Sequence, residues 1–172
     1  KVIYFFHLCT KNIHIMKTIL LAIGKTDEVY LNEGITKYTN RIIRYTPYEM
    51  KIIPDIKNSK NMSQEQQKRL EGQAILAEIN TSDTVVLLDE GGKMYSSRNF
   101  ADFFTRIAVS GTKRLVFVIG GPYGFSPEVY ARANNKISLS PMTFSHQMVR
   151  LIFAEQLYRA HTIIKGEPYH HD

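Results

Sequence analysis

Short apolar runs alternate with segments of helical periodicity from Met16 onward, and this alternation constrains the fold more than any other feature of the sequence. A short apolar run is typical of a strand that is buried on both faces, and helices between such strands connect them in parallel. The sequence therefore predicts an α/β fold with a mainly parallel sheet and helices on both faces. The expected strands are residues 17–23, 48–53, 84–88, 114–119 and 136–139.

The helical segments carry boundary signals of their own. Ser63 and Gln66 have the spacing of a capping box, in which the side chain of each residue binds the main-chain N–H of the other. Pro127 is suited to the first turn of a short helix. The buried stripe of the helix after Ser63 is expected to consist of Leu70, Ala74, Ala77 and either Ile75 or Ile79. Three longer helices are expected at residues 28–44, 97–109 and 146–164.

The chain is interpreted as one domain that starts at Met16. No repeat or Gly/Ser-rich linker interrupts residues 16–172, and the length suits a single α/β domain. Residues 1–15 differ in character and are expected to be an N-terminal extension outside the fold, because polar residues interrupt them too often for a secretory signal. The sequence also lacks the run of about 20 apolar residues that a membrane-spanning helix needs.

Charge and cysteine content narrow the class of protein. The formal net charge of +6 is a moderate basic excess, which attracts polyanions such as RNA but also fits an ordinary solvated surface. Cys9 is the only cysteine, which excludes disulfides within the chain and zinc sites built from several cysteines, and fits a reducing cytoplasm. The six histidines have no metal-binding spacing such as H-E-x-x-H, so no metal site is expected.

Three loops should contain the functional site, because ligands of parallel sheets bind at the carboxyl ends of the strands. They are residues 89–93, 120–126 and 140–145. Gly120 and Gly121 follow a buried strand, where missing side chains would let a ligand approach the main chain, although a plain tight turn would also explain them. The loop matches neither the dinucleotide-binding pattern G-x-G-x-x-G nor the phosphate-binding pattern G-x-x-x-x-G-K-[ST].

Polar side chains in the other two loops allow two interpretations each. Ser140, Thr143 and Ser145 could cap the following helix, or their hydroxyl groups could bind a small polar ligand. Asp89 and Glu90 could supply a general base if burial raised a carboxyl pKa, but acids at such a place are more often solvated. The sequence assigns no general base, and it has no G-x-S-x-G motif for a serine nucleophile.

Five segments together resemble the SPOUT-class ribosomal RNA large-subunit methyltransferase H family, whose members methylate N3 of a pseudouridine. They are MKTILLAIGK, VLLDEGGK, VFVIGGPYGFSPEV, SLSPMTFSHQMVRLIFAEQLYRA and PYHHD, and the resemblance spans residues 16–172. It implies a SPOUT (α/β-knot) fold with a C-terminal trefoil knot, which is a rare exception to unknotted topology. It also implies a cytoplasmic homodimer that binds S-adenosylmethionine in the knot and acts on ribosomal RNA, possibly requiring no metal, within the assembled ribosome.

The resemblance assigns roles to particular residues. The cofactor-binding positions that it implies are Leu88, Asp89, Gly120, Gly121, Ser140, Pro141, Met142, Thr143, Phe144 and Ser145. The candidates for positioning the RNA base are His146, Arg150, Tyr158, Arg159, Tyr169 and His171. His171 stands where the family often has arginine, so it would carry a positive charge mainly at lower pH.

Two other functions are compatible with the sequence. One is a non-enzymatic RNA-binding or ribosome-associated module on the same fold, which would bind RNA whether or not S-adenosylmethionine is present. The other is a flavodoxin-like or related nucleotide enzyme of the same fold class, which would bind a flavin or nucleotide. Fold class cannot separate these functions, because one architecture hosts many activities.

Overall fold

The computed structural model describes residues 16–57 and 61–169, and within them a five-stranded parallel sheet has the strand order β2-β1-β4-β3-β5. The predicted parallel α/β fold is thereby confirmed. The strands are β1 (Lys17–Ile23), β2 (Tyr48–Ile53), β3 (Thr84–Met94), β4 (Arg114–Ile119) and β5 (Asn135–Ser138). The helices are α1 (Val29–Ile42), α2 (Gln64–Ala77), α3 (Ser97–Val109), α4 (Pro127–Arg132) and α5 (Met148–Lys165).

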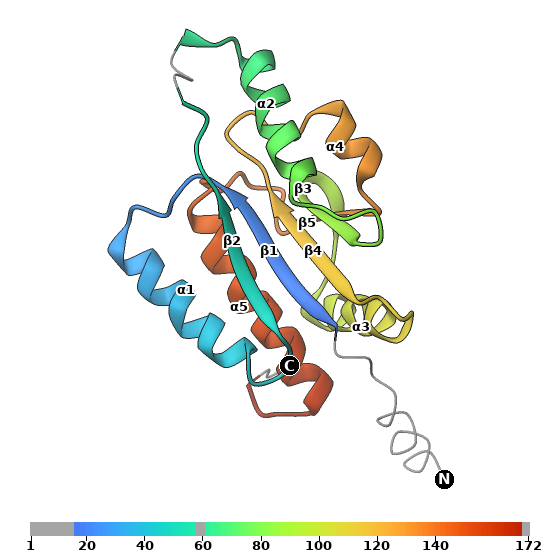
Figure 1. Cartoon of the computed structure of the whole chain (residues 1–172). Helices are drawn as coiled ribbons and strands as arrows, with labels where there is room; N and C mark the ends of the chain where they lie inside the picture. Colours follow the sequence, from blue (N-terminus) through green and yellow to red (C-terminus); the bar gives the residue numbers. More distant parts are fainter. Residues whose placement is uncertain (1–15, 58–60, 170–172) are drawn as a thin grey trace.

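The helices cover both faces of the sheet (Figure 1). One face packs against α1, α3 and α5, and the other packs against α2 and α4. Successive residues of β1 alternate between the two layers, so that Leu20 belongs to the first and Ile19 and Leu21 to the second. Burial on both faces explains why β1, β2 and β4 are continuous apolar runs and have the predicted bounds.

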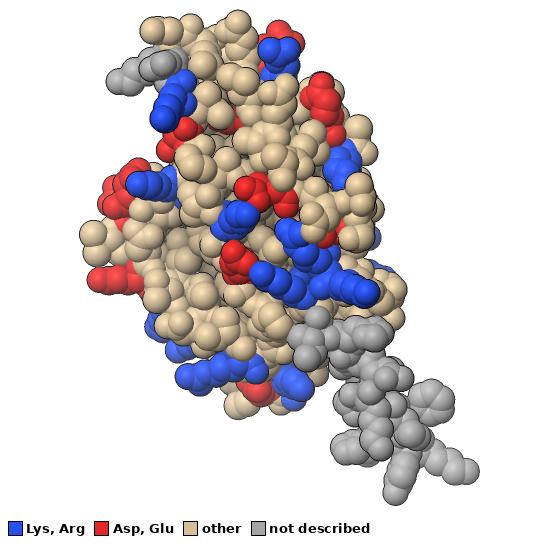
Figure 2. Space-filling model, in the orientation of Figure 1, with Lys and Arg blue, Asp and Glu red and all other residues tan. Residues whose placement is uncertain are grey.

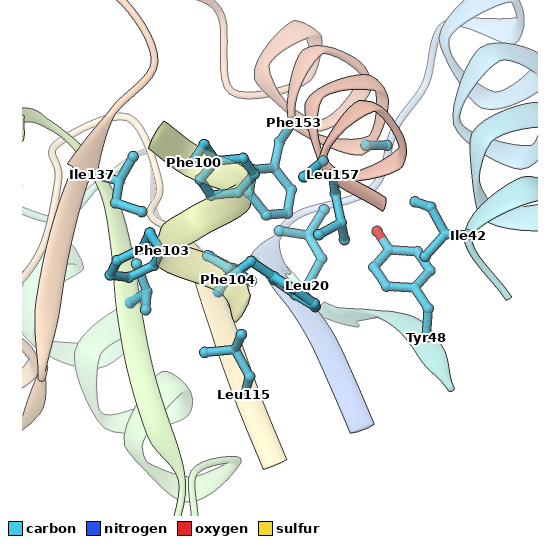
Figure 3. Close-up of a cluster of buried hydrophobic side chains, with 14 of the residues drawn as sticks. Leu20, Ile42, Tyr48, Phe100, Phe103, Phe104, Leu115, Ile137, Phe153 and Leu157 are labelled. Atoms are coloured by element: carbon cyan, nitrogen blue, oxygen red, sulfur yellow. The ribbon is translucent and has the colours of Figure 1, made fainter. Parts of the chain in front are cut away.

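The larger core layer is rich in aromatic side chains (Figure 3). Phe100, Phe103 and Phe104 of α3 meet Phe153 of α5 above the sheet. The ring centroids of Phe153 and Phe117 are 4.7 Å apart, a distance typical of favourable aromatic pairs. This packing fixes α5 against the sheet, and the segment that precedes α5 is held at the carboxyl ends of the strands.

Two predicted boundaries are wrong. The prediction ended β3 at Leu88, but the strand continues to Met94, because Lys93 and Met94 pair with Ile137 and Ser138 of β5. The expected loop 89–93 is therefore a bulge within a strand, since both Leu88 and Lys93 pair with Ile137. Strand β5 also starts and ends one residue earlier than the predicted 136–139.

Helix α2 has the predicted capping box between Ser63 and Gln66, but its buried stripe differs from the prediction. Glu71, Gly72 and Ile75 are the buried residues of the helix, and Ala77 is exposed. The prediction chose apolar side chains, whereas the helix turns a glycine toward α4 and buries a carboxyl group.

The ends of the other helices follow local signals. Ser126 caps α4 and Pro127 lies in its first turn, as predicted. Helix α5 begins at Met148, two residues after the predicted start, and ends at Gly166, whose φ of 69° suits a residue without a side chain. The expected extension, residues 1–15, lies outside the described residues. Within the described ranges, no helix is long and apolar enough to cross a membrane.

Candidate functional site

The carboxyl ends of β3, β4 and β5 surround a cavity of about 620 Å³. Its walls come from the β3 bulge, the loop between β4 and α4, and the loop between β5 and α5. These are the three segments in which the sequence placed the site, although they are far apart along the chain. The lining residues include Leu88, Asp89, Ile119, Gly120, Gly121, Tyr123, Tyr130, Ile137, Ser140, Met142, Thr143, Phe144, Ser145, His146 and Val149.

The β3 bulge is held against β5 and α4. A Cβ atom on Gly92 would lie 2.5 to 2.8 Å from main-chain atoms of Ile137, so only glycine allows the two strands to approach this closely. Both carboxylate oxygens of Asp89 accept hydrogen bonds, Oδ1 from the Gly91 N–H at 2.8 Å and Oδ2 from the Tyr130 hydroxyl at 2.5 Å. Asp89 thus fixes the bulge, and burial together with this carboxylate raises the pKa of Tyr130 to about 12.

The loop between β4 and α4 makes a tight turn at the wall of the cavity. The Gly124 N–H donates to the Gly121 carbonyl at 3.2 Å, and Gly124 has a φ of 77°, which favours glycine. A Cβ atom on Gly120 would lie 3.1 Å from the Phe125 ring. A Cβ atom on Gly121 would lie 2.4 Å from Glu71 Oε2, so the missing side chain makes room for a carboxyl group of α2.

The loop between β5 and α5 is irregular and contains hydroxyl groups with local roles. The Ser138 hydroxyl donates to the Ser140 carbonyl, and the Ser140 hydroxyl accepts from the Met142 N–H, both at 2.9 Å. The Ser145 hydroxyl accepts from the Met148 N–H at 3.2 Å and so acts as a cap at the start of α5. Met142 is 73% exposed and Phe144 is 37% exposed, which leaves apolar side chains at the rim of the cavity.

The structure brings most of the implied cofactor residues together. All of them line the cavity except Pro141, which is an exposed residue in the middle of the same loop. The sequence did not single out Tyr130, whose hydroxyl restrains the bulge, or Glu71, whose carboxyl group lies behind Gly121. Neither has a motif of its own, because both reach the site only through the packing of α2 and α4.

Arg150 does not face the surface. Its side chain is fully buried, and its guanidinium group donates to the carbonyls of Ile23 and His146 and to the Thr26 hydroxyl. Burial lowers the pKa of the guanidinium group, and the charges of Asp55 and Asp27 oppose this effect. Arg150 therefore joins the start of α5 to the end of β1, a role that the four-residue spacing from His146 did not predict.

The other candidates for RNA positioning form a separate group near the end of α5. Tyr158 and Tyr169 line a cavity of about 440 Å³ together with Arg41, Arg44 and Tyr45, and this set shares no residue with the lining of the first cavity. The Arg159 guanidinium carbon lies 4.8 Å from the Tyr169 ring centroid. Of the candidates, His146 alone lines the first cavity, and His171 lies outside the described residues.

Basic and acidic side chains are interleaved around the second cavity. Arg159 pairs with Glu155, and Tyr45 donates to Glu167, which is the main cause of the rise of the Tyr45 pKa to about 12. In Figure 2, Lys and Arg are more numerous toward the end of the molecule where α1 and α5 finish, but Asp and Glu lie among them. Within the part of the chain that the structure describes, no group of three or more His, Cys, Asp or Glu residues could hold a metal ion.

Comparison with known proteins gives a consistent result. The family described as predicted SPOUT methyltransferase matches residues 16–170. A protein of Christiangramia forsetii is 58% identical over 152 residues, which cover 88% of this chain and 97% of that protein. A protein of Parabacteroides distasonis is 56% identical over 157 residues, which cover 91% of this chain and all of that protein. Both relatives bear the name ribosomal RNA large subunit methyltransferase H.

Proposed function

The chain belongs to the SPOUT methyltransferase family, and we propose on this basis that it transfers a methyl group from S-adenosylmethionine to large-subunit ribosomal RNA. The acceptor that we propose is N3 of a pseudouridine, as the resemblance of the motifs implies. The names of the relatives support the RNA substrate, and their similarity extends over almost their whole length. The observation that carries the proposal is the convergence of three distant segments, all matching the family motifs, on one cavity.

The cavity suits a ligand of the size and character of S-adenosylmethionine. Its volume of about 620 Å³ lies within the range of small-molecule sites. Leu88, Ile137 and Val149 offer apolar contacts for an adenine ring, and the main chain of Gly120 and Gly121 is accessible without intervening side chains. We propose that Leu88, Asp89, Gly120, Gly121 and residues 140–145 hold the cofactor.

The chain's own residues have mainly a positioning role in this reaction. When bound, S-adenosylmethionine supplies a methyl group that is already activated by the sulfonium charge, so no covalent intermediate with the protein is needed. His146 is exposed and lines the cavity, which makes it the candidate for contacting the RNA base beside the cofactor. The hydrogen bonds of Asp89 and Arg150 keep two of the cavity walls in place.

The second aromatic and basic group raises the question of how one RNA reaches both places. Tyr158, Arg159 and Tyr169 do not line the first cavity, so they cannot contact the same nucleotide as His146 within one chain. A homodimer that brings the end of α5 of one subunit to the cavity of its partner would remove this difficulty. We therefore propose a homodimer, with His171 contributing from the tail, a trefoil-knotted C-terminal segment and a cytoplasmic location.

The test is methyl transfer from S-adenosylmethionine labelled in its methyl group to ribosomes that lack the modification. The labelled nucleotide is located by mass spectrometry of the ribosomal RNA, and free ribosomal RNA and separated subunits are compared with whole ribosomes. We expect label at N3 of one pseudouridine of the large subunit. Label at another nucleotide would refute the acceptor, and RNA binding with no transfer would favour the non-enzymatic module instead.

A further inference from the structure

Glu71 is a buried carboxyl group whose second oxygen has no partner. The residue is 2% exposed, and it extends from α2 toward the loop between β4 and α4. Its Oε1 accepts a hydrogen bond from Gln67 Nε2 at 2.8 Å, while Oε2 is buried and has no hydrogen-bond partner within the described residues. A buried carboxyl oxygen without a partner is costly, so its retention asks for a compensating interaction.

The carboxyl group lies directly against the wall of the first cavity. A Cβ atom on Gly121 would be 2.4 Å from Oε2 and 2.8 Å from Oε1, so no side chain separates the carboxyl group from the main chain of Gly121. Gly121 itself lines the cavity. The adjacent Gly72 lets α2 approach Ser126 equally closely, because a Cβ atom there would be 2.3 Å from the Ser126 hydroxyl oxygen. Helix α2 thus supports the loop from the side opposite the cavity.

The surroundings of Glu71 supply negative rather than positive charge. Burial raises the pKa of its carboxyl group, the Gln67 hydrogen bond opposes this, and the charge of Asp55 raises the pKa further. Asp55 is the charged residue whose field acts on Glu71, and its sign is the wrong one for compensation. A cation in the neighbouring cavity would supply the missing positive charge, and S-adenosylmethionine carries a sulfonium.

We propose that Glu71 is a positioning residue of the cofactor site, whose carboxylate acts across Gly121 to favour a cationic ligand over an uncharged analogue of similar shape. The inference rests on the proposed function. After methyl transfer the sulfonium becomes a thioether, so S-adenosylhomocysteine lacks the charge that Glu71 favours. The same carboxylate would therefore help the site to exchange product for fresh cofactor.

Calorimetric titration of Glu71→Gln with three ligands tests the proposal. The ligands are S-adenosylmethionine, S-adenosylhomocysteine and sinefungin, which has an amine in place of the sulfonium methyl group. We expect the variant to bind both cationic ligands about tenfold more weakly, the effect of one charge acting at the effective dielectric of a protein site. Binding of S-adenosylhomocysteine should change by less than about twofold on the same reasoning.

A matched control and a second measurement separate charge from support of the loop. Glu65→Gln makes the same replacement at an exposed position of α2 and should leave all three affinities unchanged. Equal weakening of all three ligands by Glu71→Gln would reduce Glu71 to a structural support and overturn the proposal, as would no weakening at all. Failure of the wild type to bind any of the three would instead refute the proposed function.

The wild type offers a test that does not depend on the folding of a variant. Lowering the pH protonates Glu71 and removes its charge, so the ratio of the S-adenosylmethionine affinity to the S-adenosylhomocysteine affinity should fall. Asp55 is the other acid whose charge acts on this group, and Asp55→Asn should shift the fall to lower pH without abolishing it. A ratio that stays constant between about pH 5 and pH 8 would contradict the proposal.

Discussion

Acid should destabilise the fold through His161, a buried histidine of α5. Its side chain stacks on Tyr45 with ring centroids 5.3 Å apart and meets the edge of Phe104 at 4.8 Å. Its Nε2 has no partner within the described residues. Burial, assisted by the charge of Lys165, lowers the pKa of His161 from 6.5 to about 4. The folded protein therefore keeps this imidazole neutral at pH values where the unfolded chain binds a proton.

The sign and size of the effect follow from linkage. Because the unfolded state binds more protons between about pH 6.5 and pH 4, the contribution of His161 to stability is present above pH 6.5 and is lost as the pH falls. With these two pKa values, lowering the pH from 8 to 5 costs about 2 kcal/mol of the free energy of unfolding. The loss would approach about 3 kcal/mol below pH 4.

Urea unfolding at constant protein concentration and ionic strength measures this contribution. His161→Phe keeps an aromatic ring between Tyr45 and Phe104 but removes the titrating group. We expect the variant to gain about 2 kcal/mol relative to the wild type between pH 8 and pH 5. His146→Phe, the same exchange at an exposed residue, is the control. A difference between His161→Phe and wild type that does not vary with pH would refute the reasoning.

Three further predictions concern the walls of the cavity. Gly92→Ala should lower the free energy of unfolding by about 1–3 kcal/mol and weaken S-adenosylmethionine binding, because its Cβ atom would collide with the main chain of Ile137; Gly91→Ala, whose nearest contact would be 3.1 Å from a side-chain oxygen of Asp89, is the control in urea unfolding and calorimetry. Arg150→Lys should cost about 2–4 kcal/mol in urea unfolding, because a lysine cannot make the three hydrogen bonds of the buried guanidinium group, whereas Arg159→Lys at a partly exposed ion pair should cost under about 1 kcal/mol; equal costs would contradict the role of Arg150. Glu71→Gln should become more stable relative to the wild type as the pH rises above about 4.5, because a carboxyl group whose pKa is raised by folding contributes stability at low pH and loses it as the pH rises through the folded pKa; a difference that is independent of pH in thermal unfolding would argue against this.

The strands could be predicted from sequence because burial on both faces makes each one a continuous apolar run. This signal fails at β3, where residues 89–94 are polar or small and are ordered by pairing with β5 rather than by their own hydrophobicity. A bulge of this kind depends on the partner strand, which lies some forty residues further along the chain by the register of Leu88 with Ile137. The position of the site was nevertheless predictable, because loops at the carboxyl ends of parallel strands meet at one edge.

The roles of single residues were less accessible to sequence reasoning. Spacing placed His146 and Arg150 on one face of a helix, but it could not reveal that His146 lines the cavity while Arg150 is buried under it. The difference arises because the guanidinium group finds three acceptors at the end of β1 and the start of α5. Burial of a charge depends on such tertiary partners, and a periodic pattern contains no information about them.

Gly121 shows how a correct position can have a different physical reason. The sequence suggested that a glycine after β4 leaves room for a ligand, but the space beside its Cα atom is taken by Glu71. A side chain at position 121 would therefore strike a buried carboxyl group of α2 before it reached the cavity. The requirement for glycine thus comes from the protein side of the wall, and it brings a charge as close to the ligand as a main chain permits. Glycine here is the means by which a helix on the far side of the loop can act on the site.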